Sequence, residues 1–514
     1  MKNWAVFATI LSGSMFAQST PPAFEIADVH PSAPGATPRM SGGVAAGQRY
    51  AIRNASMLDL IRTAYGVTDR TMLGADDNSR IVGGPNWLDL DRFDIIAKVP
   101  RSTQPETLKL MLRTLLAERF QLVVHADTRP LPGWVLSMGK GKPKMKESTG
   151  SGDSGCKAQV QFEYVCRNIT MEQFAQGLRG MGYRINSDVI NRTGLQGSWD
   201  FDLRWAGENR SVFEAIDQQL GLKLELQKIP TPVFVVDSTN RKPTDNAPDV
   251  TSRLPPLVTK FDVATIKLSM PGAQTRRRIQ PGGQLDIQAN TLRMLINLAW
   301  NINNDEMLIG APKFVDAARF DILARASTDS AKASLPVDLD DFRPMLRALL
   351  EERFMLVTHT EDRPVNAYKL VASKPKLQKA DPSNRTGCKE GPGADGKDPR
   401  VGAPWLARLL TCQNVTLAQF AELLPNWAGD YINTSVVNAT GIEGEVDLTL
   451  NFSPRGLLQQ LNQQEQAGGA DPNPNRPLSI FDGLADQLGL KLQTEKRVIP
   501  VLVIDRIQEN PTDN

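Results

Sequence analysis

The chain repeats itself, and this duplication constrains its architecture more than any other feature of the sequence. Phe24-Glu-Ile-Ala-Asp-Val returns as Phe261-Asp-Val-Ala-Thr-Ile, and the block from Leu112 to His125 returns as Leu346 to His359. Both copies end in Pro-Thr-Asp-Asn, at 243–246 and 511–514. Since 514 residues exceed the roughly 250–300 that one hydrophobic core supports, we expect two folded units in tandem.

The matched blocks define the boundaries of the expected units. Repeat 1 covers residues 18–246, repeat 2 covers 258–514, and the Pro-containing polar segment 247–257 is the expected linker. A Gly/Ser-rich stretch and a polar loop divide the repeats further, so that we expect subdomains at 18–150, 156–246, 258–385 and 388–514.

Helix and strand patterns alternate within each copy. Met57, Leu60, Ile61 and Ala64 lie on one helical face, and Ser56 stands at the N-cap position. The corresponding pattern at 292–300 follows Thr291. Further helices are expected at 112–120 and after Thr170, Ser211, Thr416 and Ser479, and strands are expected at 121–125, 134–138, 199–205, 233–236, 368–372, 446–452 and 501–504. This alternation predicts an α+β fold in which small mixed or antiparallel sheets pack against two to four amphipathic helices per copy.

The N-terminus has the pattern of an export signal. Lys2 precedes a short apolar stretch and small residues that allow cleavage after Ala17. The stretch is shorter than the about 20 residues that span a bilayer, and no later segment reaches that length. We therefore expect residues 1–17 to be a signal peptide and the mature protein to be periplasmic or extracellular. A buried N-terminal helix is the alternative.

The four cysteines occur as one pair in each repeat. Cys166 and Cys412 each stand two residues before an Asn-x-Thr sequence, and their upstream mates are Cys156 and Cys388. Equivalent positions favour the disulfides Cys156–Cys166 and Cys388–Cys412 among the three possible pairings. A zinc site is the alternative, but no histidine lies nearby and the spacing is not Cys-x-x-Cys.

Composition excludes some partners and offers little for others. Lys and Arg number 59 against 57 Asp and Glu, so the net charge of +2 argues against nucleic-acid binding. With three histidines and four cysteines, we expect no metal site and no cofactor.

Two glycine-containing segments resemble catalytic motifs only superficially. Gly152-Asp-Ser154-Gly155 resembles the nucleophile loop of serine proteases, but it has no counterpart in repeat 2. Gly391-Pro-Gly-Ala-Asp-Gly396 fits a phosphate-binding pattern, but it lies in a polar loop rather than between a strand and a helix. Both are interpreted as loops.

His125 and His359 are the repeated pair worth weighing as functional positions. Histidine is a general base near neutral pH, yet no nucleophile accompanies either residue in both copies. An exposed structural histidine is the competing interpretation. Asp200 and Asp202 resemble an acid pair, but repeat 2 has Thr449 in place of the second. The repeated Glu118-Arg119 is explained by charges at a helix C-terminus.

Five ordered blocks, present in whole or in part in both copies, carry a family resemblance. They are Phe-Glu-Ile-Ala-Asp-Val, Met-Leu-Asp-Leu-Ile-Arg-Thr-Ala-Tyr-Gly, Gly-Gly-Pro-Asn-Trp-Leu-Asp with Asp-Arg-Phe-Asp-Ile, Leu-Leu-Ala-Glu-Arg-Phe, and Asn-Arg-Thr-Gly-Leu-Gln-Gly. Over nearly all the mature chain the sequence resembles the soil-associated protein family of exported proteins, which is expanded in Acidobacteria and sometimes attached to a BlaR1-like membrane metallopeptidase. Repeat 2 departs from it at Trp300-Asn301 and at Gly310-Ala-Pro-Lys-Phe. The resemblance implies no activity and no catalytic residues.

The function we expect from these features is that of an exported, non-enzymatic binding or assembly module at the cell envelope or outside the cell. Its partner is an unidentified envelope or extracellular ligand or protein. The alternatives are an extracytoplasmic hydrolase with a site between subdomains that uses His125, and a sensor ectodomain that works beside a membrane peptidase.

Overall fold

The computed structural model describes most of the chain. It covers residues 21–513 except 34–39, 68–79, 102, 151, 161–162, 182–184, 186–187, 206–211, 281–282, 327–338, 383, 392–407 and 460–476. The expected signal peptide, the cap Ser211 and most of the 391–396 loop lie outside the described residues.

Repeat 1 contains two subdomains joined by a long ribbon. Its first part consists of β1 (Ile26–Pro31), β2 (Ser41–Ala46), β3 (Arg49–Ser56), α1 (Met57–Tyr65), β4 (Ile81–Gly83), η1 (Asn86–Asp89), β5 (Arg92–Lys98), α2 (Pro105–Phe120) and β6 (Val123–Met138). Its second part consists of β7 (Lys146–Glu147), β8 (Gly155–Val160), β9 (Glu163–Thr170), α3 (Met171–Met181), β10 (Val189–Arg192), β11 (Ser198–Arg204), α4 (Val212–Ala215), η2 (Ile216–Leu220) and β12 (Leu222–Ser238).

Repeat 2 follows the short linker helix α5 (Val250–Arg253) with the same order of strands. Its first part consists of β13 (Val263–Leu268), β14 (Arg276–Gln280), β15 (Gln284–Thr291), α6 (Leu292–Trp300), η3 (Asp305–Met307), β16 (Leu308–Ile309), η4 (Lys313–Asp316), β17 (Arg319–Arg325), α8 (Leu339–Arg353) and β18 (Val357–Ala372). Its second part consists of β19 (Gln378–Lys379), β20 (Gly387–Glu390), β21 (Arg408–Thr416), α9 (Leu417–Trp427), β22 (Val436–Asn438), β23 (Glu445–Phe452), α11 (Ile480–Gly483), η6 (Leu484–Leu488) and β24 (Leu490–Arg506).

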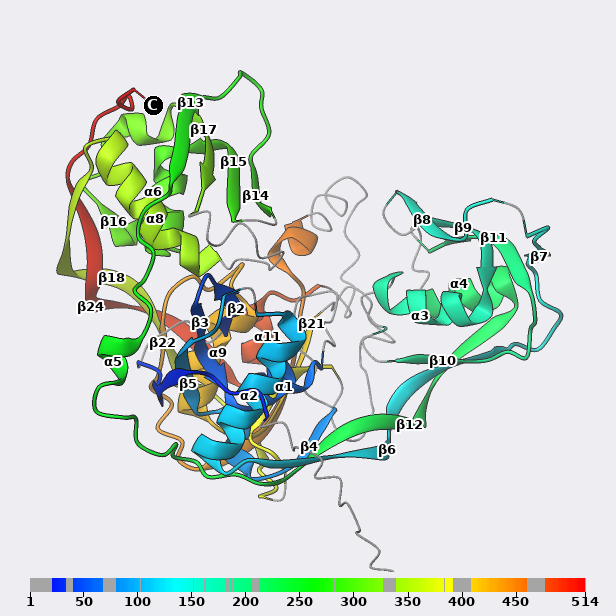
Figure 1. Cartoon of the computed structure of the whole chain (residues 1–514). Helices are drawn as coiled ribbons and strands as arrows, with labels where there is room; N and C mark the ends of the chain where they lie inside the picture. Colours follow the sequence, from blue (N-terminus) through cyan, green and yellow to red (C-terminus); the bar gives the residue numbers. More distant parts are fainter. Residues whose placement is uncertain are drawn as a thin grey trace, which may run out of the picture.

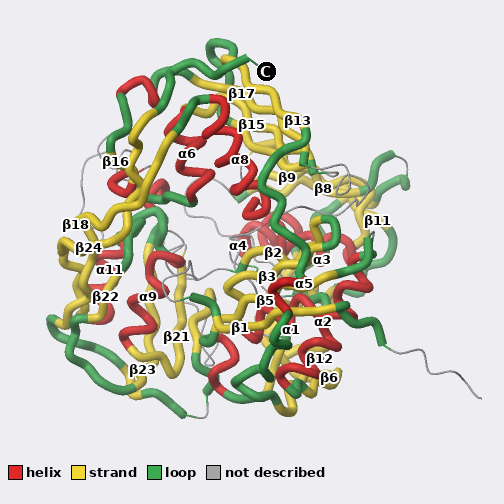
Figure 2. Tube along the Cα trace, turned by 60° about the vertical axis from the view of Figure 1, so that its left-hand side comes forward, coloured by secondary structure: helices red, strands yellow, loops and turns green. Residues whose placement is uncertain are grey.

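The described strands form three four-stranded sheets in each repeat. The orders β1-β5-β3-β2 and β7-β11-β9-β8 in repeat 1 become β13-β17-β15-β14 and β19-β23-β21-β20 in repeat 2. We name the four subdomains built on these sheets 1A, 1B, 2A and 2B. Each has its own cluster of buried apolar side chains, and in subdomain 2A the helices α6 and α8 lie together beside the sheet in both views (Figures 1 and 2). The mixed α+β fold and the duplication are thus confirmed.

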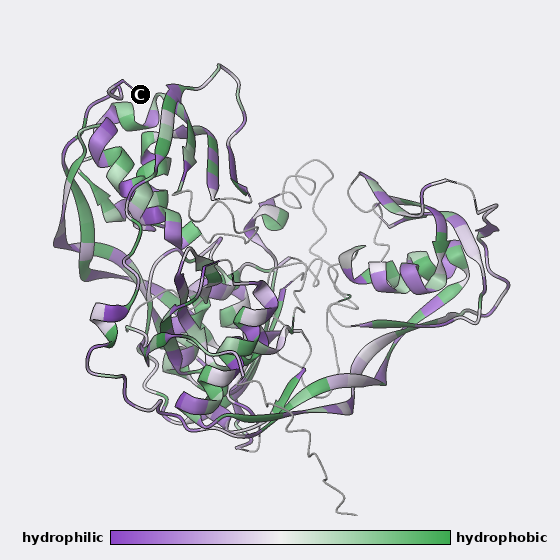
Figure 3. Cartoon of the chain, in the orientation of Figure 1, coloured by the Kyte–Doolittle hydropathy of each residue, from purple (hydrophilic) through white to green (hydrophobic). Residues whose placement is uncertain are grey.

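Local sequence signals explain why the helices begin where they do. The Ser56 hydroxyl accepts a hydrogen bond from the backbone N–H of Asp59, whose carboxylate accepts one from the N–H of Ser56. Thr416 and Gln419 form the same reciprocal capping box at α9. Such a cap contributes about 1 kcal/mol to stability. Hydrophobic and hydrophilic residues alternate along the helices and strands (Figure 3), as the sequence periodicity predicts.

The third sheet of each repeat is a long ribbon that connects the two subdomains. β6 and β12 pair antiparallel over their whole length, with Pro130 opposite Pro230. The strands expected separately at 121–125 and 134–138 are therefore one strand of 16 residues. Figure 1 shows this ribbon reaching from subdomain 1A to subdomain 1B. Proline donates no backbone hydrogen bond, so these residues discourage another strand from pairing with the open middle of the ribbon.

Each subdomain of a repeat adds one short strand to an edge of this ribbon. β4 of subdomain 1A pairs parallel with β12, and β10 of subdomain 1B pairs parallel with β6. Val236, near the end of β12, lies in the core of subdomain 1A. The subdomains therefore differ from the consecutive ranges 18–150 and 156–246, because the last strand of the repeat completes the first subdomain.

A shared bulge shows that each repeat is itself a duplication. Asn54 and Asn168 both have positive φ (54° and 46°), and a helix begins three residues after each of them. Their backbone N–H groups donate to Asp94 (2.7 Å) and Asp200 (2.8 Å) on the neighbouring strand. In repeat 2 the N–H groups of Ala289 and Asn414 donate to Asp321 (3.0 Å) and Asp447 (2.7 Å). The same bulge in all four subdomains makes the chain a fourfold repeat of one βα unit.

The C-terminal tail of repeat 1 folds back on subdomain 1A. The Arg119 Nε donates to the Thr244 Oγ1 at 2.9 Å, and the Asn246 side chain bonds both the N–H and the C=O of Val29. The expected linker 247–257 includes α5, which packs on β1 with Val250 only 5% exposed. The repeated Pro-Thr-Asp-Asn is thus a structural tail, and Arg119 binds it in addition to ending a helix.

Candidate functional site

His125 lies on the subdomain 1A end of the ribbon and forms a hydrogen bond across it. The Nδ1 of His125 on β6 is 2.8 Å from Oδ2 of Asp237 on β12. Val235 is the direct cross-strand neighbour of His125, so Asp237 occupies the diagonal position. Both side chains are exposed, by 53% and 42%.

A second charged pair follows on the same face of β6. Asp127 and Arg129 stand two and four residues after His125, and the Arg129 Nε donates to Asp127 Oδ2 at 2.8 Å. The hydrogen bond from Arg129, with another from the Thr128 N–H, holds the pKa of Asp127 below its usual value. We name His125, Asp127, Arg129 and Asp237 the ribbon cluster of repeat 1.

Repeat 2 carries the same cluster at the same place. His359 Nδ1 is 2.9 Å from the Asp505 carboxylate, and Arg363 Nη2 donates to Glu361 Oε2 at 3.0 Å. The exposures of the four side chains, 49%, 43%, 50% and 43%, resemble those of repeat 1. Since exposed charged residues contribute little to folding, this duplicated cluster is the strongest candidate for a functional surface.

In both ribbon clusters a carboxylate on the partner strand holds the imidazole. The carboxylate orients the imidazole through Nδ1, and in repeat 2 the Nε2 of His359 lies 3.9 Å from Oε2 of Glu361. The described hydrogen bonds of both imidazoles go to carboxylates, and none goes to a serine, threonine or cysteine side chain. Within the described ranges, no three His, Cys, Asp or Glu side chains are placed to hold a metal ion.

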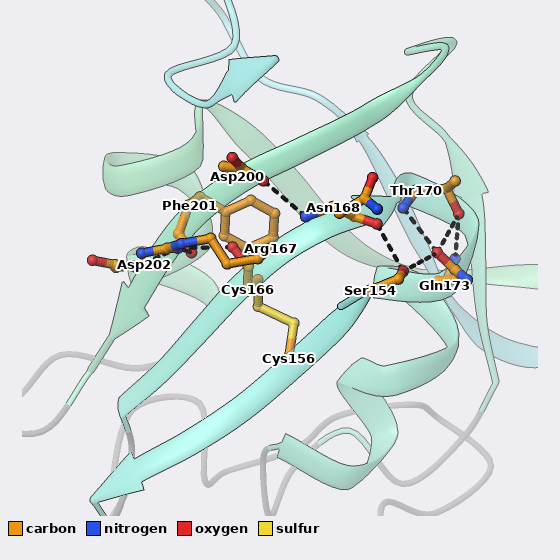
Figure 4. The surroundings of a disulfide bond; sticks show 10 residues. All are labelled: Ser154, Cys156, Cys166, Arg167, Asn168, Thr170, Gln173, Asp200, Phe201 and Asp202. Atoms are coloured by element: carbon orange, nitrogen blue, oxygen red, sulfur yellow. Dashed lines mark hydrogen bonds and ion pairs between the residues drawn. A yellow bond between two sulfur atoms is a disulfide. The ribbon is translucent and has the colours of Figure 1, made fainter. Parts of the chain in front are cut away.

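The other sequence candidates have structural roles. Cys156–Cys166 and Cys388–Cys412 are disulfides between directly opposed residues of neighbouring strands. Figure 4 shows the first bond with Ser154, whose hydroxyl donates to the Asn168 carbonyl oxygen at 2.7 Å. That contact joins a loop to a strand, because residues 152–154 lie in the expected loop and Gly155 begins β8.

Asp200 and Asp202 do not form an acid pair. Asp200 accepts the Asn168 N–H, which holds the pKa of its carboxyl below the usual value, whereas Asp202 pairs with Arg167 at 2.8 Å (Figure 4). The Asp200 carboxylate therefore stabilises the bulge, and the Asp202 carboxylate belongs to an exposed ion pair.

A polar contact joins the two repeats, and no pattern in the sequence predicted it. The Arg385 guanidinium, just before β20, donates to the carbonyl oxygen of Ile81 at 2.7 Å and to that of Gly83. Nearby, burial raises the pKa of Asp89 to about 7; the Asp59 carboxylate adds to the rise, and Arg92 and Arg385 oppose it. The corresponding Asp316 in repeat 2 instead pairs with Arg293 at 2.7 Å. The signal in the sequence was that Leu58 stands where repeat 2 has Arg293, the partner of Asp316.

The described part of the chain includes no helix that is long and apolar enough to cross a membrane.

No curated protein and no solved structure matches the sequence. A family model described as proteins of unknown function, DUF3738, matches residues 58–239 and 293–507, which correspond to the two repeats. The chain therefore belongs to this family and carries two copies of its domain in tandem.

Proposed function

We propose that the chain is an exported binding and assembly protein, without catalytic turnover, that acts at the cell envelope or outside the cell. The observation that carries this proposal is the duplicated ribbon cluster. His, an acidic residue and Arg occupy alternate positions of β6 and β18, and an Asp completes each set from the partner strand.

Two equal clusters on one chain suit bivalent binding. Each cluster presents an imidazole, two carboxylates and a guanidinium, which together donate and accept hydrogen bonds to a polar partner. Once one cluster is bound, the other meets the same partner surface at a high effective concentration, so that avidity exceeds the affinity of either.

Export is supported by the cysteines and by the N-terminal pattern. Both disulfides join neighbouring strands of small subdomains, which is typical of proteins from oxidising compartments. The resemblance to the soil-associated family of exported proteins points the same way, and it also keeps the sensor ectodomain as an alternative. The hydrolase alternative lacks a nucleophile among the described contacts of His125.

Binding of the mature protein to an isolated envelope fraction tests this function. We expect His125→Ala and His359→Ala each to weaken binding, and the double variant to weaken it further because avidity is lost. Gln227→Ala, at an exposed ribbon position outside the cluster, is the matched control. Equal binding by the wild type and the double variant would contradict the proposal. Turnover of ester, peptide or glycoside substrates that disappears in His125→Ala would favour the hydrolase.

A further inference from the structure

The sheet of subdomain 1A is covered on the face that points away from its own core. Arg49, Ala51 and Arg53 alternate with core residues on β3 and thus lie on this outer face. Arg53 Nη2 is 3.1 Å from Asp341 Oδ1 in α8 of repeat 2, and Arg49 Nη1 donates to the Pro255 carbonyl oxygen at 2.5 Å. Ala51, between the two arginines, is only 5% exposed. The linker and repeat 2 therefore cover this face.

The equivalent face of subdomain 2A is open. Leu323 on β17 stands at its centre, opposite Thr265 on one side and Asp286 on the other, and is 48% exposed. Val263 on β13 is 64% exposed. Their counterparts in subdomain 1A, Ile96 and Ile26, are both half-buried. Since the two sheets have the same strand order, the outer face of 2A is the uncovered form of a surface that the chain already uses for contact.

The helix that corresponds to α8 in repeat 1 is α2, and among the described residues no hydrogen bond or ion pair joins its first turn to repeat 2. α2 and α8 share the sequence that ends at Glu-Arg-Phe, which aligns the first turn of α2 with the first turn of α8. Asp341 of α8 pairs with Arg53, whereas Glu106 in the first turn of α2 is 81% exposed and pairs with Lys109 of its own helix at 2.7 Å. Within the described residues, a chain thus has an open sheet face in repeat 2 and a helix start in repeat 1 that does not pair with the other repeat.

The two residues that pair in the contact within the chain are both replaced at the corresponding positions of the open face and of α2. Where the covered face has Arg53, the open face has Gln288, and where α8 has Asp341, α2 has Thr107. A charged pair in the contact within the chain is replaced by a neutral polar pair at the corresponding positions. Either combination avoids an unpaired charge in the contact. Glu106 adds a negative charge that complements Lys267 and Arg325, both exposed on the open face.

We propose that the outer face of the 2A sheet binds the first turn of α2 in a second copy of the chain. Because two different surfaces meet, the contact does not close on itself, and chains associate head to tail into linear assemblies. This inference rests on the assembly part of the proposed function. Envelope binding by the ribbon clusters is measured separately, so that either can fail without the other.

Sedimentation of the mature protein over a wide concentration range tests the proposal. We expect the sedimentation coefficient of the wild type to rise with concentration. Leu323→Asp on the sheet face and Glu106→Arg on the helix should each weaken self-association by at least about tenfold. The first places a charge at the centre of the contact, and the second reverses a charge at its edge. Val498→Asp, at a 69% exposed ribbon position, introduces the same charge away from both surfaces and should leave association unchanged.

Mixing the two interface variants distinguishes a head-to-tail contact from a symmetric one. The Leu323→Asp chain keeps an intact helix, and the Glu106→Arg chain keeps an intact sheet face. The mixture should therefore form a dimer, and nothing larger, although neither variant associates alone. A wild type that stays monomeric throughout, an association that Leu323→Asp leaves unchanged, or a mixture without dimer would each overturn the proposal. Unaltered circular dichroism of both variants excludes misfolding as the cause.

Discussion

Arg385 of repeat 2 donates a hydrogen bond of 2.7 Å to the backbone carbonyl oxygen of Ile81 in repeat 1, 304 residues away in sequence. The guanidinium also reaches the carbonyl oxygen of Gly83. One cation thus binds two backbone acceptors of the other repeat, beside the Asp89 carboxyl.

Removing this guanidinium should weaken the contact between the repeats. We expect Arg385→Ala to lower the free energy of unfolding by about 1–3 kcal/mol, because two acceptors lose a charged donor. Arg363→Ala, at a half-exposed ribbon arginine, is the control and should change stability by less than about 1 kcal/mol. Urea unfolding measures both. Equal effects of the two substitutions would contradict a role for Arg385 at the interface.

The raised pKa of Asp89 predicts a pH dependence of stability. An aspartic acid titrates near 3.8 in the unfolded chain and at about 7 here, so between these values the folded protein binds more protons than the unfolded chain. Stability contributed by this group therefore falls as the pH rises from about 4 to about 7, by up to about 1.4 kcal/mol per pH unit. Asp89→Asn should remove that contribution. Parallel pH profiles of wild type and variant would show that Asp89 does not titrate in this range.

The two disulfides should stabilise the protein unequally. They close loops with sequence separations of 10 and 24 residues, and the loop-entropy model makes the longer one worth about 0.8 kcal/mol more. We expect the paired Cys→Ser variants at 156/166 and 388/412 each to lose about 2–4 kcal/mol, the second the more. Mass mapping of unreduced peptides should find these same two pairs. A bond between the repeats would contradict the assignment.

The two repeats should fold separately. Each has its own pair of hydrophobic cores, so chains of residues 18–246 and 257–514 should unfold cooperatively on their own. A chain that stops at Ser238 lacks the tail bound by Arg119 and should be less stable by about 1–3 kcal/mol. Calorimetry of the three chains provides the comparison. Aggregation of both repeats alone, with recovery on mixing, would contradict independent folding.

The mature N-terminus should lie near Gln18. The positive charge at Lys2, the apolar stretch and the small residues before Gln18 predict cleavage after Ala17. N-terminal sequencing of the native protein from periplasmic and extracellular fractions tests this. A chain that begins at Met1 in the cytosol would contradict export.

Features that depend on neighbours in the sequence were predictable. The caps at Ser56 and Thr291, the buried face of α1, the alternating strand β11 and the positions of the disulfides all follow from patterns within a few residues or from the repeat itself. The finer duplication was not predicted, because the likeness of Asn54-Ala-Ser-Met to Asn168-Ile-Thr-Met is too short to establish it without the shared bulge.

By itself the sequence determined the α+β class, the tandem duplication and the helix starts, because capping and periodicity act over one or two turns of chain. Only the tertiary structure decided that two expected strands are one ribbon, that His125 meets Asp237, and that Arg385 reaches Ile81. Such contacts depend on strand register and on the packing of one repeat against the other. Residues more than a hundred positions apart become neighbours through these non-local interactions, which leave no pattern in the local sequence.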